Sequence, residues 1–353
     1  MSTHVHRRIP SLDGLRAVSI ILVIASHVLL GMRIQPAANI GDLGVRIFFV
    51  ISGFLITGII AGEMQANGRL DLLRFYYRRT LRIFPPYYFF LLVLAALAML
   101  GKVLITARQL LPALTYTSDY IYPEQWDIDH AWSLSVEEQF YLIFPGILAF
   151  VGPRKMTVLL GLVLVLCPVL RVVDHSVFAD LQPIWLTKGF HANLDTLAAG
   201  CLLALLRNRL HSSSSYMRLL NSRLLIALPP LIFLINSQID YTGQNLGVLY
   251  SANNLLMALM IDRFVTRSSD ATGRLLNWQP MVIIGMMSYS IYLWQQPFLN
   301  PETPSRLFTF PLNILGFTAC VLISYFVVER YSLRLRKRYE RELFTETREP
   351  AVA

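Results

Sequence analysis

Apolar segments of about 18–22 residues recur along the whole chain, each long enough to span the roughly 30 Å of hydrocarbon in a bilayer. Within a membrane, only helices and closed barrels satisfy their backbone hydrogen bonds. Charged residues make up 15% of the chain, whereas an ordinary soluble domain carries roughly 25%. The sequence therefore predicts an all-α integral membrane protein, a bundle of about ten transmembrane helices. The expected spans are residues 11–31, 43–62, 83–101, 132–151, 156–173, 189–206, 222–238, 246–262, 281–299 and 308–329.

Basic residues are distributed unevenly between these spans. Of the 31 Lys and Arg, 23 fall on one side and six on the other, while Arg16 and Arg46 lie within spans. Because cytoplasmic loops carry an excess of Lys and Arg, both termini are expected in the cytoplasm. The net charge of +9 then reflects membrane topology. It does not indicate nucleic-acid binding, because the basic residues are scattered over several short loops.

Neither a Pro- or Ser-rich linker nor an internal repeat divides the sequence. Residues 1–340 are expected to form a single transmembrane domain, and residues 341–353 a short, disordered cytoplasmic tail. The three cysteines all fall in apolar spans, so we interpret them as buried apolar residues. The stretch Leu104–Tyr116 is apolar but short, and we expect an external interfacial or re-entrant segment there.

Two ionisable residues, Arg16 and His27, lie eleven positions apart in the first span. On a helix they share one face, about 20° apart in rotation and about 16 Å apart along the axis. Asp13 stands three residues before Arg16 and would neutralise it. One interpretation is a snorkelling Arg and an interfacial His. We favour the other, in which the pair faces a wet cavity and His27 acts as a general base on a hydroxyl group.

A dense basic cluster, FYYRRTLRIFPPYY, precedes the third span. Arg79 and Arg82 stand three residues apart in it, so they share a helix face. Guanidinium groups suit phosphates, such as those of a coenzyme A donor. The alternative is positive-inside anchoring between interfacial tyrosines.

Two adjacent carboxylates lie at the outer start of the fourth span, in WSLSVEEQFYLIFP. Ser135 and Glu138 have the spacing of a capping box, which gives Glu138 a structural explanation. Glu137 has no such explanation and shares a helix face with Tyr141. It is expected to orient His27 or bind a sugar hydroxyl, unless it belongs to a solvated helix start.

Weaker polar groups occur in later spans. His191 and Asp195 stand four residues apart and are expected to form a local pair. The ninth span carries a polar and aromatic strip, which is more typical of contacts between helices than of chemistry. Its members are Ser288, Tyr289, Tyr292, Trp294 and Gln295.

Taken in order, SLDGLRAVSIILVIASH, GVRIFFVISGFLIT, FYYRRTLRIFPPYY, WSLSVEEQFYLIFP and SYSIYLWQQP resemble acyltransferase family 3. These are integral-membrane O-acyltransferases that modify bacterial surface polysaccharides, O-antigens, glycolipids and some antibiotics. The resemblance implies a multi-pass protein of the inner (cytoplasmic) membrane. Acyl-CoA, most simply acetyl-CoA, is then the donor substrate, with no permanently bound cofactor. The acceptor is a hydroxyl of a surface polysaccharide, a lipid-linked sugar or a glycosylated small molecule.

The family motifs can be carried over residue by residue. The Arg-x10-His motif falls on Arg16 and His27, the Arg-x-x-Arg motif on Arg79 and Arg82, and the W-S-L-x-x-E element ends at Glu137. The resemblance implies that Arg79 and Arg82, helped by Arg16, hold the CoA phosphates. His27 is then the general base, with Glu137 orienting it. Direct transfer needs no metal, and the sequence shows no metal-ligand set; an acyl-histidine intermediate is the other route.

This sequence departs from the family pattern at two positions. Gln295 stands where members usually have His after Tyr-Leu-Trp, so we assign it no role in proton transfer. Arg46 stands where the GVxxFF motif often has Asp, which leaves its partner open and allows a role in acceptor choice. Many members also carry a C-terminal esterase-like domain, which we do not expect behind this basic tail.

A transporter or flippase for a lipid-linked sugar is the main rival, because ten spans with buried ionisable residues would suit it equally. The sequence shows neither an internal repeat nor a matching pair of Gly/Pro-broken helices in its support. Binding of CoA would distinguish the two classes, since a flippase does not need CoA. A structural scaffold leaves the shared face of Arg16 and His27 unexplained.

Overall fold

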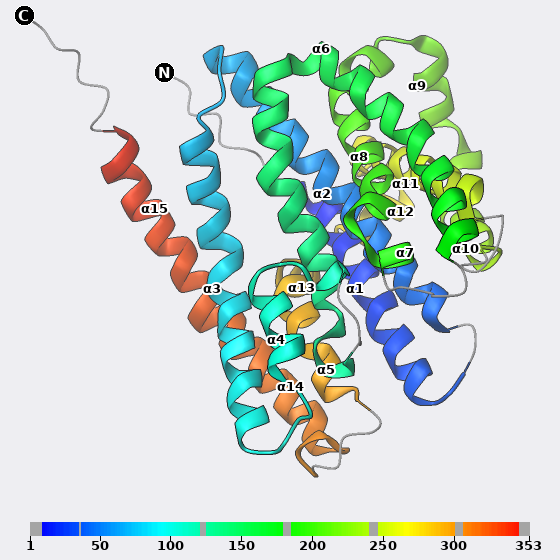
Figure 1. Cartoon of the computed structure of the whole chain (residues 1–353). Coiled ribbons are helices and arrows are strands. Elements are labelled where there is room, and N and C mark those ends of the chain that lie inside the picture. The colour runs from blue at the N-terminus through cyan, green and yellow to red at the C-terminus, as the bar shows by residue number, and fades with distance from the viewer. Residues whose placement is uncertain are drawn as a thin grey trace, which may run out of the picture. The chain divides into compact units, whose positions relative to one another are not determined.

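The computed structural model describes residues 9–34, 37–120, 125–178, 185–239, 246–300 and 306–345. Every regular element within these ranges is a helix (Figure 1). The chain divides into two compact units. Unit 1 consists of Met1–Gly62 and Val151–Ser288, and unit 2 of Glu63–Phe150 and Tyr289–Ala353.

Unit 1 is built around helix α11, against which α1, α8 and α10 pack. Its apolar core includes Leu12 from α1, Val50 from α2 and Ile261 from α11. Pro10 begins α1, because its fixed φ suits the first position of a helix. The helices that contribute to unit 1 are α1 (Pro10–Gly31), α2 (Ala37–Asn67), the second half of α6 (Ala131–Phe178), α7 (Trp185–Lys188), α8 (Phe190–His211), α9 (Ser214–Asn221), η2 (Arg223–Ala227), α10 (Leu228–Ser237), α11 (Leu246–Thr266), α12 (Ala271–Leu276) and the first half of α13 (Gln279–Phe298).

Helices α2 and α8 cross where each carries a glycine. A Cβ atom on Gly53 would collide with the carbonyl oxygen of Leu197, and one on Gly200 would collide with that of Val50. Small residues allow two helix backbones to approach this closely in a membrane. The crossing therefore explains why glycine stands at position 53.

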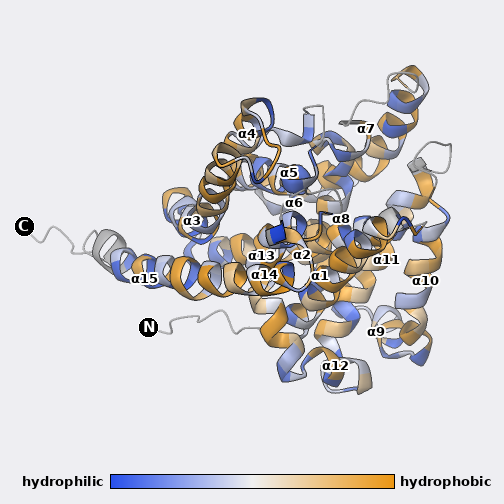
Figure 2. Ribbon diagram, turned by 90° about the horizontal axis from the view of Figure 1, so that it is seen from below, coloured by the Kyte–Doolittle hydropathy of each residue, from blue (hydrophilic) through white to orange (hydrophobic). Residues whose placement is uncertain are grey.

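Unit 2 is organised around α3 (Leu72–Met99), which begins where the Asp71 side chain accepts a hydrogen bond from the Arg74 amide at 3.0 Å. Helix α15 (Arg330–Thr345) runs beside α3 (Figure 1) and alternates polar and apolar residues (Figure 2). The remaining helices of unit 2 are α4 (Ala107–Leu114), η1 (Ser118–Tyr120), α5 (Trp126–Asp129), the first half of α6, the second half of α13, η3 (Arg306–Phe308), α14 (Leu312–Leu322) and the π-helix η4 (Ile323–Glu329).

Within the described ranges, six helices are long and apolar enough to cross a membrane, or seven if the bent pair Ser214–Asn221 and Arg223–Ser237 forms one span. The all-helical, membrane-spanning class is therefore confirmed. Two of the expected spans lie in α6, where the dihedrals of Gly152 (φ 78°, ψ 163°) interrupt the helix. The count of ten spans and the cytoplasmic placement of both termini stay predictions.

The two segments expected outside the spans are partly helical. The short stretch Leu104–Tyr116 contains the eight-residue helix α4. Helix α15 includes residues 341–345 of the expected tail, and residues 346–353 lie outside the described ranges.

Candidate active site

Helix α1 of unit 1 carries both Arg16 and His27, and both residues are half-buried. The Arg16 Nη1 atom lies 3.9 Å from Asp13 Oδ1, so the expected pair at the start of the helix is confirmed. Close packing fixes this end of α1, because a Cβ atom on Gly285 of α13 would collide with the Asp13 carbonyl. His27 follows Arg16 by three helical turns on the same helix.

Unit 2 places Arg79 differently from its neighbours on α3. The Arg79 guanidinium carbon lies 3.4 Å from the centroid of the Tyr141 ring on α6, a cation–π contact. Its Nε atom is buried and has no hydrogen-bond partner among the described residues. Arg82, three residues further along, is exposed. Arg79 is thus held by an aromatic ring while one of its N–H donors stays unused.

Two other arginines of the basic cluster have a structural role. The Nε atoms of Arg74 and Arg78 donate hydrogen bonds to Glu340 Oε1 at 2.9 and 2.7 Å. These contacts attach α15 to α3. Sequence spacing alone did not separate these two arginines from Arg79.

The capping box predicted for Ser135 and Glu138 is wrong. Helix α6 begins at Ala131, so Ser135 lies inside the helix, where its hydroxyl donates to the Ala131 carbonyl at 2.9 Å. The same oxygen accepts a hydrogen bond from the Ser118 amide at 3.2 Å. Glu138 therefore has no capping role and instead lies within electrostatic reach of Arg79. Sequence reasoning missed Glu138 because the motif did not indicate where the helix begins.

A tyrosine cluster lies within electrostatic reach of Glu138 and consists of Tyr87, Tyr88, Tyr116 and Tyr289. The Tyr87 hydroxyl donates to the Ala113 carbonyl at 2.8 Å and the Tyr88 hydroxyl to that of Leu114 at 3.1 Å. The Tyr289 hydroxyl donates to the Ile83 carbonyl at 3.1 Å. Unit 2 thus gathers Arg79, a carboxylate and four phenols in one polar region.

Glu137 is half-buried in unit 2 and lies within electrostatic reach of Tyr289 and Tyr292. The structure therefore brings Glu137 into the same unit as Arg79 and Arg82. Arg16 and His27 belong to unit 1. The predicted action of Glu137 on His27, and of Arg16 on the donor phosphates, stays a prediction.

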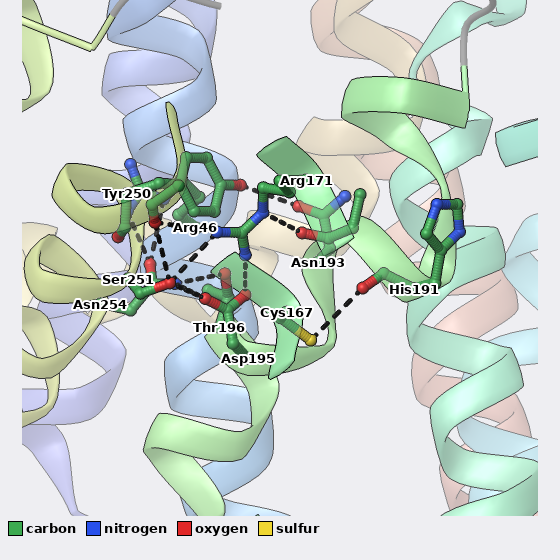
Figure 3. A network of polar contacts seen from close by, with 12 residues as sticks. Arg46, Cys167, Arg171, His191, Asn193, Asp195, Thr196, Tyr250, Ser251 and Asn254 are labelled. Carbon is green, nitrogen blue, oxygen red and sulfur yellow. Dashed lines mark hydrogen bonds and ion pairs between the residues drawn. The ribbon is translucent and has the colours of Figure 1, made fainter. Parts of the chain in front are cut away.

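The local pair expected between His191 and Asp195 is wrong, because each residue has a different ionic partner. His191 Nε2 lies 3.3 Å from Asp174 Oδ2. Asp195 forms an ion pair with Arg171 and accepts a hydrogen bond from Ser251 (Figure 3). The four-residue spacing of His191 and Asp195 therefore does not bring them into contact as a pair.

Arg46, whose partner the sequence left open, is fully buried in the polar network of unit 1 (Figure 3). It donates hydrogen bonds to Asn236 Oδ1 at 2.9 Å, to Asn254 Oδ1 at 3.1 Å from Nε, and to the Tyr250 carbonyl at 2.6 Å. Its guanidinium carbon lies 3.6 Å from the centroid of the Tyr250 ring. Arg46 therefore joins α2 to α10 and α11.

The polar strip on α13 makes contacts between helices, as expected, in its part that belongs to unit 2. The Tyr292 and Ser133 hydroxyls lie 2.5 Å apart. Beside the strip, the Ser290 hydroxyl lies 3.2 Å from the Ser324 hydroxyl and 3.2 Å from a carboxylate oxygen of Glu329. Gln295 is fully buried. These contacts attach α13 to α6 and to the π-helix η4.

Comparisons with known proteins agree on one activity class. A family model described as an acyltransferase domain matches residues 9–329. O-acetyltransferase OatA of Staphylococcus aureus is 30% identical over 318 residues, which cover 83% of this chain and 51% of that protein. The putative peptidoglycan O-acetyltransferase YrhL of Bacillus subtilis is 29% identical over 362 residues, which cover 93% of this chain and 55% of that protein.

The chain thus spans about half the length of these curated relatives. No solved structure matches it. The family match covers nearly the whole chain, from α1 through the π-helix η4. This multi-pass membrane protein is an acyltransferase and belongs to acyltransferase family 3.

Proposed function

We propose that this acyltransferase moves an acyl group, most simply acetyl, from acyl-CoA to a carbohydrate hydroxyl at the cytoplasmic (inner) membrane. The names of the relatives support acetyl as the group, because both are O-acetyltransferases. One of them is named for peptidoglycan, which makes a hydroxyl of a cell-surface glycan the first acceptor to test. Glu137 is a candidate for binding that hydroxyl.

One observation supports acyl-CoA as the donor substrate. The buried Nε–H group of Arg79 has no hydrogen-bond partner among the described residues. Leaving a buried N–H unpaired costs about 1–3 kcal/mol, and more when the group is charged. A phosphate oxygen would satisfy it with a charge-assisted hydrogen bond. Arg82, three residues away and exposed, supplies a second positive charge for the same ligand. The diphosphate and 3′-phosphate of CoA supply oxygens and negative charge for both Arg79 and Arg82.

The proposed chemistry is direct transfer. The acceptor oxygen forms a bond to the acyl carbon, and His27 takes the proton that the hydroxyl loses. The C–S bond then breaks, and the departing CoA thiolate accepts the proton from His27. These steps need no metal, and they leave the free thiol of CoA and an O-acyl ester as products.

Donor binding tests the phosphate assignment. Arg79→Gln should weaken the binding of acetyl-CoA to purified protein in detergent about 10–100-fold, because one charge-assisted contact is worth about 1.5–3 kcal/mol. Arg69→Gln is the matched control, because it removes the same charge from an exposed position just before α3. Equal affinities for the two variants would contradict the assignment, as would the absence of CoA binding by folded wild-type protein, which would favour a flippase.

Measurements of turnover test whether His27 is the general base. His27→Ala should abolish acetyl transfer or hydrolysis while the dissociation constant of acetyl-CoA stays within about threefold of wild type. Arg82→Ala should instead weaken CoA binding. A His27→Ala protein with wild-type turnover would remove His27 from the mechanism.

A further inference from the structure

Tyr116 adopts a backbone conformation that is unusual for a bulky residue. Helix α4 ends in a Schellman motif, in which the Thr117 amide donates to the Pro112 carbonyl at 2.9 Å and the Tyr116 amide to that of Ala113 at 3.3 Å. This motif requires a left-handed residue at the position of Tyr116, whose φ is 53°. Glycine usually fills that position, because a side chain there is strained.

Helix α3 shows the same motif with the usual residue. The Lys102 amide donates to the Leu97 carbonyl, and the left-handed residue is Gly101 at φ 66°. Tyrosine in the equivalent place costs about 1–3 kcal/mol of strain. Contacts of the Tyr116 side chain can offset this strain.

Stacking interactions explain why an aromatic ring occupies position 116. Its centroid lies 4.6 Å from that of Tyr87, and the two rings are 20° from parallel. The ring also stacks on Phe84 at 5.6 Å, and the residue is only 8% exposed. A buried aromatic pair of this kind contributes about 0.5–1.5 kcal/mol beyond the area that it buries. Phenylalanine would make the same contacts, so stacking leaves the hydroxyl unexplained.

The Tyr116 hydroxyl is buried and has no hydrogen-bond partner within the described residues, unlike those of Tyr87, Tyr88 and Tyr289. A buried hydroxyl without a partner costs about 1–3 kcal/mol. The rest of Tyr116 is held firmly, because Gln139 Nε2 donates to its carbonyl at 2.9 Å and to Asp119 Oδ1 at 2.8 Å. The Tyr116 hydroxyl is therefore held in a fixed place, although it donates no hydrogen bond to any described residue.

That place belongs to the polar region of unit 2. Tyr116 stacks on Phe84 and Tyr87, which follow Arg79 on α3 by five and eight residues, or about 7.5–12 Å along the helix axis. A donor whose phosphates bind Arg79 can therefore extend its acyl arm along α3 toward Tyr116. Burial, followed by the neighbouring Tyr289 and Glu138, raises the pKa of Tyr116 above its ordinary value. The phenol therefore stays protonated at neutral pH and can donate a hydrogen bond.

We propose that the Tyr116 hydroxyl donates a hydrogen bond to the carbonyl oxygen of the donor's acyl thioester. This inference rests on the proposed function, because it assumes an acyl-CoA donor. As the acceptor oxygen bonds to the acyl carbon, the carbonyl oxygen gains negative charge and the hydrogen bond strengthens. The C–S bond then breaks, the carbonyl reforms, and the thiolate takes the proton that the general base had removed from the acceptor.

Tyr116→Phe tests the proposal, because it keeps the ring and removes the hydroxyl. Loss of one such donor lowers kcat about 10²–10³-fold, and we expect this fall together with a much smaller rise, about 3–10-fold, in the dissociation constant for acetyl-CoA. Tyr76→Phe is the matched control, since it removes from α3 of the same unit a hydroxyl that already donates to a backbone carbonyl, that of Leu142 at 2.7 Å. It should keep kcat within about threefold of wild type.

A donor analogue supplies a second measurement. S-ethyl-CoA lacks the carbonyl oxygen, so wild-type protein should bind acetyl-CoA about 3–10-fold more tightly, and Tyr116→Phe should lose that preference. If Tyr116→Phe does not fold, the test uses wild-type protein alone and compares its affinities for acetyl-CoA and S-ethyl-CoA. Equal affinities for the two ligands overturn the proposal. A wild-type kcat in Tyr116→Phe, or equal losses in both variants, also overturns it. Wild-type protein that neither binds nor turns over acetyl-CoA overturns the proposed function instead.

Discussion

Arg46 shows how this chain keeps a cation inside a helix bundle. Three side-chain and backbone acceptors and an aromatic face surround its guanidinium, and Asp42 Oδ2 lies 3.7 Å away, one turn earlier on α2. Every acceptor belongs to a helix that Arg46 helps to join. These contacts give Arg46 a structural role and supply the partners that the sequence left open.

Removing this guanidinium should destabilise unit 1 strongly. We expect Arg46→Met to cost about 3–5 kcal/mol, because Asp42 would lose its ionic neighbour and buried amide oxygens would lose their donors. The midpoint of thermal unfolding in detergent micelles measures the effect. Arg154→Ala, which removes an exposed arginine from the same unit, should leave the midpoint almost unchanged. Similar midpoints for the two variants would contradict a structural role for Arg46.

Sequence reasoning at the residue scale succeeded for contacts within one turn of helix. The ion pair between Asp13 and Arg16 is local, so its spacing was sufficient. The hydrogen-bond partners of Arg46 lie 190–208 residues away, and no spacing rule reaches them. Glu138 was assigned to a cap because its motif resembles a helix start, although the helix begins at Ala131.

At the scale of elements, apolar length identified most of the helices. It did not show where they cross, because a crossing depends on which small residues face each other across two helices. Gly53 and Gly200 illustrate this point, since each is accommodated by the backbone of the other helix. The unusual end of α4 was equally hidden, because its sequence has tyrosine where the motif favours glycine.

Two alanine variants on α2 test the crossing. Gly53→Ala should destabilise the protein by about 1–3 kcal/mol, because the added methyl group forces α2 away from α8. Gly58→Ala lies on the same helix with nothing near its Cβ position, and it should be neutral or stabilising by up to about 1 kcal/mol, as helix propensity predicts. Thermal unfolding of both variants in the same detergent gives the comparison. A Gly53→Ala protein as stable as Gly58→Ala would show that the helices do not cross at this point.

At the scale of the whole molecule, neither unit is a continuous stretch of sequence. Each combines an earlier and a later segment, and α2, α6 and α13 contribute residues to both units. Composition and hydropathy do not reveal such a division, because both units contain helices long and apolar enough to cross a membrane. Charge carries the topological information instead, through the 23 and six basic residues on the two expected sides.

Single cysteines test the expected topology. In a background with Cys167, Cys201 and Cys320 replaced by alanine, Lys102→Cys should react with a membrane-impermeant maleimide in intact spheroplasts. Lys155→Cys should react only after the membrane is permeabilised, because the excess of basic residues places its loop in the cytoplasm. Both positions are exposed. The reverse labelling pattern would contradict the orientation.

The distant partners of Arg46 also set an order of events during synthesis. Asn254 follows Arg46 by 208 residues, so a ribosome that adds about 5–20 residues per second makes it roughly 10–40 s later. Until then, Asp42 is the ionic neighbour that α2 itself provides. A nascent or truncated chain that stops before α11 keeps an incompletely compensated cation in α2. Burial of Arg46 thus distinguishes a finished chain from an unfinished one, and a membrane protease that recognises exposed charge could use the same difference.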